Sequence, residues 1–181
     1  QTWRRADLPV QTIFSMNYDM DTPFRVYASV QDHGSYRAAI DIRNGRENLK
    51  AINWEGAPGG EYTQHAVDPR DPNIVYSGKL SRTDYSVAAG ARGGAGAGAA
   101  GRAAGAAAAT PPAGPPPPQR ETNIRPPAGP NNDPLRMQVL APIHLSPHDP
   151  DTVYFGSQYL YRSRDRGTTW ERVTPDQSYS D

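Results

Sequence analysis

Residues 163–170 are Ser163-Arg164-Asp165-Arg166-Gly167-Thr168-Thr169-Trp170, and the prediction of an all-β fold starts from them. Asp165 can accept hydrogen bonds from the backbone N–H groups of a tight turn. Gly167 can adopt the positive φ that a chain reversal requires. Residues 159–163 and 169–173 are then expected to pair as a β-hairpin, with the Trp170 indole packed under the turn and between neighbouring sheets.

A second pattern occurs three times and places a proline three residues before a Val-Tyr pair. The copies are Asp21-Thr22-Pro23-Phe24-Arg25-Val26-Tyr27, Asp71-Pro72-Asn73-Ile74-Val75-Tyr76 and Asp149-Pro150-Asp151-Thr152-Val153-Tyr154. A proline fixes φ and ends one strand, and the Val-Tyr pair begins the next one. The three prolines lie 49 and then 78 residues apart, and a period of about 40–50 residues with several short strands is typical of a β-propeller blade.

The longer of these two intervals contains a low-complexity block at residues 88–134. Residues 88–109 are 13 Ala, 7 Gly and 2 Arg, and residues 110–134 contain 10 of the 19 prolines. Such a composition buries too little apolar surface to offset the entropy of ordering the chain. We therefore predict a disordered insertion, which is either a tolerated surface loop or a tether.

These patterns predict an all-β chain that forms a partial β-propeller of about two to three four-stranded blades. Residues 1–87 are expected to supply the first blades, residues 88–134 the insertion, and residues 135–181 a blade that contains the hairpin. Because a propeller needs about four or more blades to close, we expect the remaining blades to come from further sequence or from partner chains.

Composition argues against several other functions. The 19 basic and 19 acidic residues give zero net charge, whereas a nucleic-acid-binding chain usually carries a basic excess. The absence of cysteine excludes disulfides, thiol catalysis and cysteine metal sites. No run of about 18 apolar residues is present, so we expect no membrane span. We predict no metal and no cofactor, because metal-ligand spacing is missing among His33, His65, His144 and His148.

Residues 163–170 match Ser-x-Asp-x-Gly-x-Thr-Trp, the pattern of the Asp-box. Together with the run that precedes it, the motif resembles the bacterial BNR/Asp-box-repeat, sortilin-like β-propeller proteins, often labelled glycosyl hydrolases. The preceding run is Ile143-His144-Leu145-Ser146-Pro147-His148-Asp149-Pro150-Asp151-Thr152-Val153-Tyr154-Phe155-Gly156-Ser157. Residues 26–35, 62–69 and 123–126 are also similar to that family, although His33 stands where the family commonly has Asn. The resemblance implies an extracytoplasmic protein, secreted or periplasmic, of which this chain is a fragment.

The first functional hypothesis is a non-catalytic recognition scaffold that binds a peptide, protein or glycan on a face or in the channel of the assembled ring. The candidate ligand-binding residues are Gln31, Asp32 and Ser35, because they belong to a polar turn, residues 31–35, that follows a predicted strand. A plain β-turn also accounts for these residues. In the hairpin, a structural role is assigned to Ser163, Asp165, Gly167, Thr169 and Trp170.

Two alternatives stay open. A module of a glycoside hydrolase would need two carboxyl groups at a set separation across the scissile bond. The sequence singles out no pair among the candidates Asp19, Asp21, Asp32, Asp41, Glu55, Glu61 and Asp68. A structural assembly subunit would instead be tethered to a surface or a complex by residues 88–134.

Overall fold

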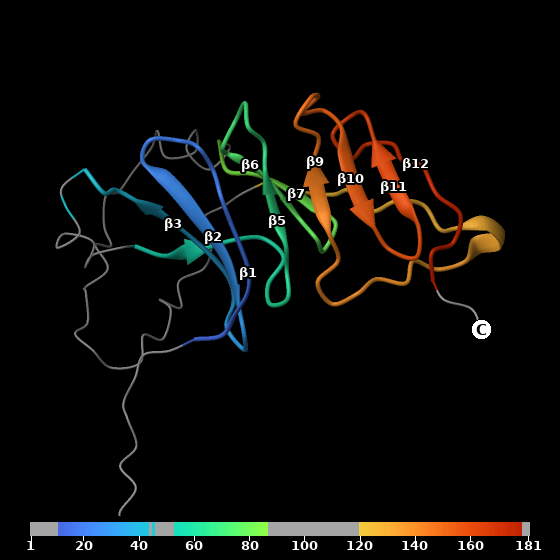
Figure 1. Cartoon of the computed structure of the whole chain (residues 1–181), viewed down its shortest axis with the longest axis horizontal. Helices are drawn as coiled ribbons and strands as arrows, with labels where there is room; N and C mark the ends of the chain where they lie inside the picture. Colours follow the sequence, from blue (N-terminus) through green and yellow to red (C-terminus); the bar gives the residue numbers. More distant parts are fainter. Residues whose placement is uncertain (1–10, 44, 46–52, 87–119, 179–181) are drawn as a thin grey trace, which may run out of the picture.

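The computed structural model describes residues 11–43, 45, 53–86 and 120–178. Over these residues the chain is all-β, which confirms the predicted fold class, and its twelve strands form three antiparallel sheets of four strands each. Each sheet uses four strands that follow one another along the chain. Figure 1 shows the three sheets next to one another, in chain order, along the long axis of the molecule.

The strands are short and rich in β-branched and aromatic residues, which favour extended backbone. Sheet 1 contains β1 (Ile13–Tyr18), β2 (Phe24–Val30), β3 (Gly34–Ile40) and β4 (Glu55–Gly56). Sheet 2 contains β5 (His65–Val67), β6 (Ile74–Ser77), β7 (Ser81–Asp84) and β8 (Arg120–Asn123). Sheet 3 contains β9 (Ile143–Leu145), β10 (Val153–Gly156), β11 (Leu160–Ser163) and β12 (Glu171–Arg172).

A short 3-10 turn, η2, lies at Pro130–Asn132. None of the described helical residues forms a segment of the length and apolarity needed to cross a membrane.

The repeated proline pattern occupies the same place in all three sheets, between the first strand and the second. In each copy the Val-Tyr pair lies in the second strand, which is β2, β6 or β10. Each turn begins at a buried polar residue whose backbone N–H donates to the carbonyl six residues later. These bonds join Asp19 to Arg25 at 3.0 Å, Asp68 to Ile74 at 3.0 Å and Ser146 to Thr152 at 2.9 Å. The sequence repeat is therefore a repeat of one structural unit.

Strand register repeats as well. A tyrosine of the second strand stands opposite an arginine of the third strand in each sheet. The pairs are Tyr27 with Arg37, Tyr76 with Arg82, and Tyr154 with Arg162. In sheets 1 and 3 the arginine also forms an ion pair with a glutamate of the fourth strand, at 2.7 Å for Arg37–Glu55 and 2.8 Å for Arg162–Glu171. The glutamate follows a tryptophan in both sheets, Trp54 or Trp170.

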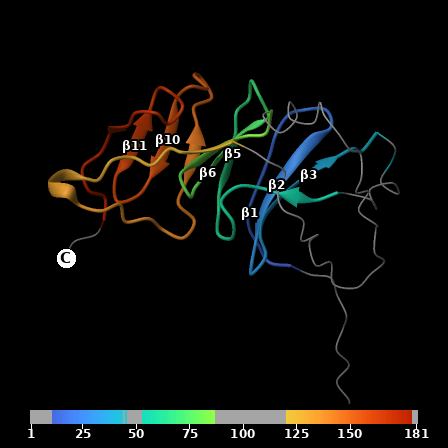
Figure 2. The same ribbon diagram turned by 180° about the vertical axis from the view of Figure 1, so that it is seen from behind.

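The first strands of the sheets lie side by side, because β1 contacts β5 and β5 contacts β9. The turns at residues 19–23, 68–73 and 146–152 lie along one edge of the array, which we call the turn edge. The connections between sheets, residues 57–64 and 124–142, leave from the opposite edge, which we call the linker edge. In Figure 1 the turn edge of sheets 2 and 3 is uppermost, and Figure 2 shows the same array from behind.

Apolar side chains fill the space between neighbouring sheets. The larger cluster joins sheets 2 and 3 and includes Tyr76, Val153 and Phe155, each with no exposed surface. The smaller cluster joins sheets 1 and 2 through Tyr27 and Val75. Because each large apolar side chain contributes about 1.5–3 kcal/mol when it is buried, the contacts between sheets, rather than any sheet alone, stabilise the array.

Residues 120–134 differ from the sequence prediction, which assigned them to the disordered insertion. Arg120–Asn123 form β8, the fourth strand of sheet 2, and Ile124 is 2% exposed in the core. The prediction was wrong for these residues because the proline content of the whole block outweighed a short segment with ordinary strand and core residues. The rest of the predicted insertion, residues 88–119, lies outside the described residues.

Candidate functional site

The predicted ligand-binding residues lie in the hairpin turn between β2 and β3, at the linker edge. Gln31 and Asp32 are exposed, and Asp32 adopts a positive φ of 61°. Ser35 is 6% exposed, and its hydroxyl donates a hydrogen bond to the Gly60 carbonyl at 2.5 Å. Gln31 and Asp32 are therefore available to a ligand, whereas Ser35 fastens the turn to the linker between sheets 1 and 2.

An apolar depression of about 530 Å³ opens on the linker edge. Its lining comes from three segments that are distant in sequence: Phe14 in β1, Tyr62 in the first linker, and Gln138, Val139 and Leu140 in the second linker. The rings of Phe14 and Tyr62 lie with their centroids 4.2 Å apart and their planes inclined by 31°. Aromatic rings beside a side-chain amide offer an apolar platform with a polar rim, which suits a peptide side chain or a sugar ring.

The depression and the predicted turn belong to one neighbourhood. Desolvation, followed by the carboxylates of Glu61 and Asp32, raises the pKa of the Tyr62 phenol. The bond from Ser35 to Gly60 ties the turn to the linker that carries Tyr62. Asp32 thus lies near the depression, with Gln31 exposed next to it in the same turn.

The hairpin between β11 and β12 is held by the side chains of its own turn. Asp165 accepts from the backbone N–H of Thr169 at 2.7 Å and from the Thr169 hydroxyl at 2.6 Å. Ser163 donates its hydroxyl to Asp165 at 2.8 Å and accepts from the N–H of Gly167 at 2.7 Å. Gly167 has φ of 88° and carries no Cβ, which would lie 2.9 Å from Cβ of Ile124. With both carboxylate oxygens bonded inside the turn, Asp165 is poorly placed to act on a ligand.

Trp170 joins this hairpin to the neighbouring sheet. Its indole N–H donates to the Ile124 carbonyl, just beyond β8, at 2.7 Å. The ring packs against the larger core cluster and meets Phe155 edge to face, with ring centroids 6.5 Å apart. The indole therefore lies between sheets 2 and 3.

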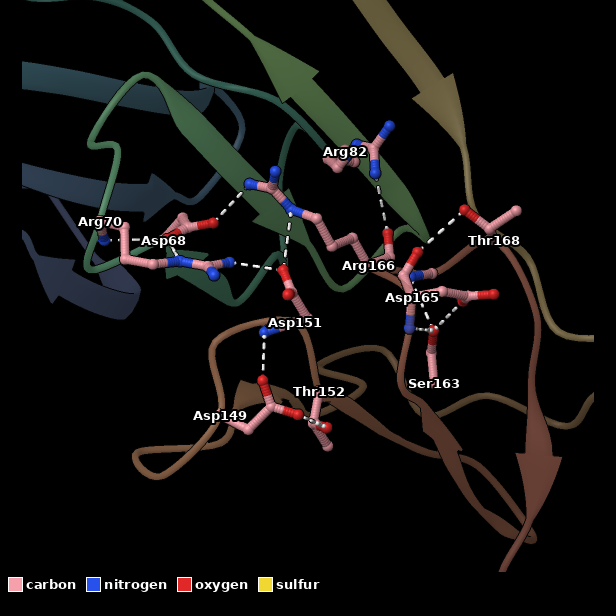
Figure 3. Close-up of polar contacts among 11 residues, drawn as sticks. Asp68, Arg70, Arg82, Asp149, Asp151, Thr152, Ser163, Asp165, Arg166 and Thr168 are labelled. Carbon is pink, nitrogen blue, oxygen red and sulfur yellow. Dashed lines mark hydrogen bonds and ion pairs between the residues drawn. The ribbon is translucent and has the colours of Figure 1, made fainter.

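A group of charged residues at the turn edge links sheets 2 and 3, and we call it the inter-sheet clamp (Figure 3). It consists of Asp68 and Arg70 from sheet 2 and Asp151 and Arg166 from sheet 3. Arg166 donates to Asp68 and Arg70 donates to Asp151, both at 2.5 Å. The Asp68 side chain has no exposed surface, so its charge depends on these partners for compensation.

Every described carboxyl group with a shifted pKa is shifted downward. The groups are Asp41, Asp151, Asp165, Glu171 and Asp176. The largest cause in each case is a hydrogen bond donated by a neighbouring side chain, such as the guanidinium of Arg70 for Asp151. The general acid of a glycoside hydrolase needs the opposite, a raised pKa. These five carboxyl groups therefore suit binding and structural roles better than proton transfer.

His65 is the only buried histidine among the four. Its Nε2 lies 2.9 Å from the Pro58 carbonyl and so carries the proton, while burial lowers the pKa of the imidazole. The Asn17 amide donates to the His65 carbonyl across the contact between β1 and β5. In the described part of the chain, no group of three or more His, Asp or Glu side chains could hold a metal ion. His65 belongs to the packing of sheet 1 on sheet 2.

Acid should weaken the hairpin in a range set by Asp165. The hydrogen bond from the Thr169 hydroxyl is the largest cause that lowers the pKa of Asp165 to about 2. Because the folded-state pKa lies below the unfolded value, this stabilisation is complete above about pH 4 and is lost as the pH falls toward about 2. Thermal unfolding followed by circular dichroism should show a steeper loss of Tm over this range for the wild type than for Asp165→Asn. Parallel curves for the two proteins would contradict the assignment.

Sequence reasoning missed both the depression and the clamp. Phe14, Tyr62 and Val139 share no motif, and no sequence signal pointed to them. A sequence signal for the clamp existed. Asp68 precedes Pro72, the proline of the second repeat, by four residues, and Asp19 precedes Pro23, the proline of the first repeat, by the same number. That spacing indicated that both carboxylates begin a turn.

The chain matches no protein-family model, and no curated protein or solved structure matches it either. The resemblance to Asp-box propellers therefore stays a prediction, and the function has to be argued from the geometry of the described residues.

Proposed function

We propose that the chain is a three-sheet segment of an Asp-box β-propeller and acts as a non-catalytic recognition scaffold for a peptide, protein or glycan. One observation carries the proposal: three sheets repeat the same strand order and register, with their first strands in contact. Blades arranged around an axis have this relation, because their innermost strands surround the channel. A secreted or periplasmic location is part of the proposal and rests on the family resemblance alone.

The linker edge is the proposed recognition surface. In blades of this order, the connections from blade to blade and the turns between second and third strands gather at one end of the ring. The depression lined by Phe14 and Tyr62 lies at this end, next to the turn that carries Gln31 and Asp32. An apolar platform with exposed amide and carboxylate groups nearby supports contact with an extended peptide or a sugar chain.

The Asp-box residues support the scaffold without contacting the ligand in this proposal. They lie at the turn edge, opposite the depression, and their polar atoms are engaged in the hairpin or in the contact with sheet 2. The lowered carboxyl pKa values favour recognition over hydrolysis by these groups. A catalytic pair would have to come from carboxyl groups other than these.

Binding can be tested on the 181-residue chain with an immobilised random-peptide library and a panel of neutral oligosaccharides. The best binder is then titrated calorimetrically into the wild type and three variants. Tyr62→Ala should weaken Kd about tenfold, because it removes one half of the aromatic platform. Tyr62→Phe should bind like the wild type, and so should Arg164→Ala, which alters an exposed residue at the turn edge.

Two results would overturn the proposal. One is the absence of binding to either panel at millimolar concentration. The other is an equal loss of affinity in Tyr62→Ala and Arg164→Ala, because a specific platform at the linker edge predicts a loss only in the first.

A further inference from the structure

The aromatic platform of the depression is held in place by its own linker. Tyr62 has a φ of 54°, a left-handed conformation that is unfavourable for an aromatic residue. The Thr63 hydroxyl donates to the Gly59 carbonyl at 2.8 Å, just before this residue in the chain. The Ser35 hydroxyl donates to the Gly60 carbonyl from the neighbouring turn. A ring fixed by such contacts needs little further ordering when a ligand binds, which favours affinity.

The lining of the depression is mostly apolar. Phe14, Val139 and Leu140 contribute apolar side chains, and Val139 is 57% exposed. The polar groups of the lining side chains are the Gln138 amide and the Tyr62 hydroxyl. A sugar ring carries hydroxyls on most of its carbon atoms, and covering them with aliphatic side chains would leave them without hydrogen-bond partners. This lining therefore favours a peptide with apolar residues over a glycan.

The charged residues around the depression are acidic. The segments that form or border it are β1, the first linker at 57–64, the turn at 31–35 and residues 138–140. They contain two carboxylates, Asp32 and Glu61, one histidine, His33, and no lysine or arginine. Desolvation is the largest cause of the raised pKa of Tyr62, and both carboxylates add to it, which places them near the phenol. Neither carboxylate forms an ion pair with another residue of the described ranges.

The cation nearest to this lining in sequence is already paired. Arg136 precedes Gln138 by two residues, and its guanidinium lies 2.5 Å from the Asp176 carboxylate and 3.6 Å from the Asp133 carboxylate. These two carboxylates compensate its charge. The surroundings of the depression therefore keep a negative local charge, which favours a cationic group on the ligand.

We infer that the ligand of the depression is a peptide segment that presents an arginine, with the guanidinium against the Tyr62 ring and paired with the carboxylates of Asp32 and Glu61. The inference rests on the proposed recognition function and specifies its ligand. A guanidinium suits this site because its planar group stacks on an aromatic face while its N–H groups donate to carboxylates. Apolar residues beside the arginine would cover Val139 and Leu140.

The same combination of groups occurs inside the fold. The Arg37 guanidinium lies 3.2 Å from the centre of the Tyr85 ring and pairs with the Glu55 carboxylate at 2.7 Å. An arginine that contacts a tyrosine ring and a carboxylate at once is therefore a geometry that this chain already contains.

Two matched peptides test the inference on the 181-residue chain. One is the pentapeptide Gly-Leu-Arg-Leu-Gly, acetylated and amidated so that its ends carry no charge. The other replaces the arginine with citrulline, which has nearly the same shape and is neutral. Calorimetric titration should give a Kd at least about tenfold lower for the arginine peptide. Equal affinities would overturn the inference, and so would the absence of arginine-peptide binding at millimolar concentration.

Two variants test which carboxylates meet the guanidinium. Asp32→Asn and Glu61→Gln should each weaken binding of the arginine peptide about fivefold and leave binding of the citrulline peptide unchanged. Asp41→Asn is the matched control, because it changes the net charge equally but follows β3 at the turn edge, where Asp41 pairs with Arg43. It should bind both peptides like the wild type.

Equal losses in all three variants would contradict the inference, because they would mean that only the overall charge of the chain matters. The same holds if neither Asp32→Asn nor Glu61→Gln loses affinity for the arginine peptide.

The recognition proposal and this inference can be distinguished by how they fail. Binding of a neutral oligosaccharide that depends on Tyr62, with the arginine and citrulline peptides equally weak, would overturn the inference alone. Arginine-peptide binding that Tyr62→Ala and Arg164→Ala weaken equally would overturn recognition at the depression, and the inference with it.

Discussion

Replacing Trp170 with alanine should lower the free energy of unfolding by about 3 kcal/mol. The substitution removes a large ring from the contact between sheets 2 and 3, where the indole packs against Phe155 and the core cluster. It also leaves the Ile124 carbonyl without the N–H that donates to it at 2.7 Å. Urea unfolding followed by far-ultraviolet circular dichroism measures the change.

Trp170→Phe is the matched control. It retains a large apolar ring but removes the five-membered ring that carries the N–H donor, so a smaller loss of about 1 kcal/mol is expected. If Trp170→Ala unfolds at the wild-type urea midpoint, the contact between the hairpin and Ile124 does not stabilise the array, and the assignment of Trp170 to the interface is wrong.

Replacing Asp68 with alanine should lower the free energy of unfolding by a similar amount, about 3 kcal/mol. Asp68 is fully buried and accepts from the Arg70 backbone N–H at 2.9 Å as well as from the Arg166 guanidinium. Its removal leaves the half-buried Arg166 guanidinium and the Arg70 backbone N–H without the carboxylate that accepts their hydrogen bonds. Chemical denaturation of Asp68→Ala, Arg166→Ala and the double variant gives the coupling between the two residues.

Asp21→Ala is the control for Asp68→Ala, because it removes an exposed carboxylate from the corresponding turn of sheet 1. Asp21 is 40% exposed and bridges Arg25 at 3.0 Å, a geometry that usually contributes about 0–1 kcal/mol. Additive losses in the Asp68 and Arg166 single variants would contradict the clamp, because a buried ion pair requires that the second substitution has less effect than the first.

The fold was predictable where short-range chemistry determines the backbone. A proline before Val-Tyr marks the turn and the second strand in each sheet, and the positions of Asp165 and Gly167 mark the hairpin. These features depend on residues only a few positions apart, so a single sequence contains them. Trp54-Glu55 and Trp170-Glu171 also repeat, and this similarity could have indicated that β4 and β12 are equivalent strands.

The candidate site was less predictable, because its parts come together only in the folded chain. The depression combines residues of β1 with residues of two linkers, and the clamp joins Asp68 to Arg166 across 98 positions of sequence. No periodicity connects such residues. Ser35 shows the opposite case, a residue that the sequence suggested for ligand binding and the fold does not leave free. It is buried, and its hydroxyl donates a hydrogen bond to the Gly60 carbonyl.

The pairing of β7 with β8 has a consequence for how this protein can change. Asp84 stands opposite Arg120, so the long segment between them starts and finishes at adjacent points on the turn edge. The entropy of closing such a segment rises only logarithmically with its length, by about 0.6 kcal/mol for each doubling. Beyond Tyr85, which packs in the core cluster between sheets 1 and 2, sequence can therefore be gained, lost or exchanged for a foreign domain before β8 with little effect on the sheet. We therefore expect this site to tolerate insertions in natural variants and in engineered proteins. It lies at the end of the molecule opposite the proposed recognition surface.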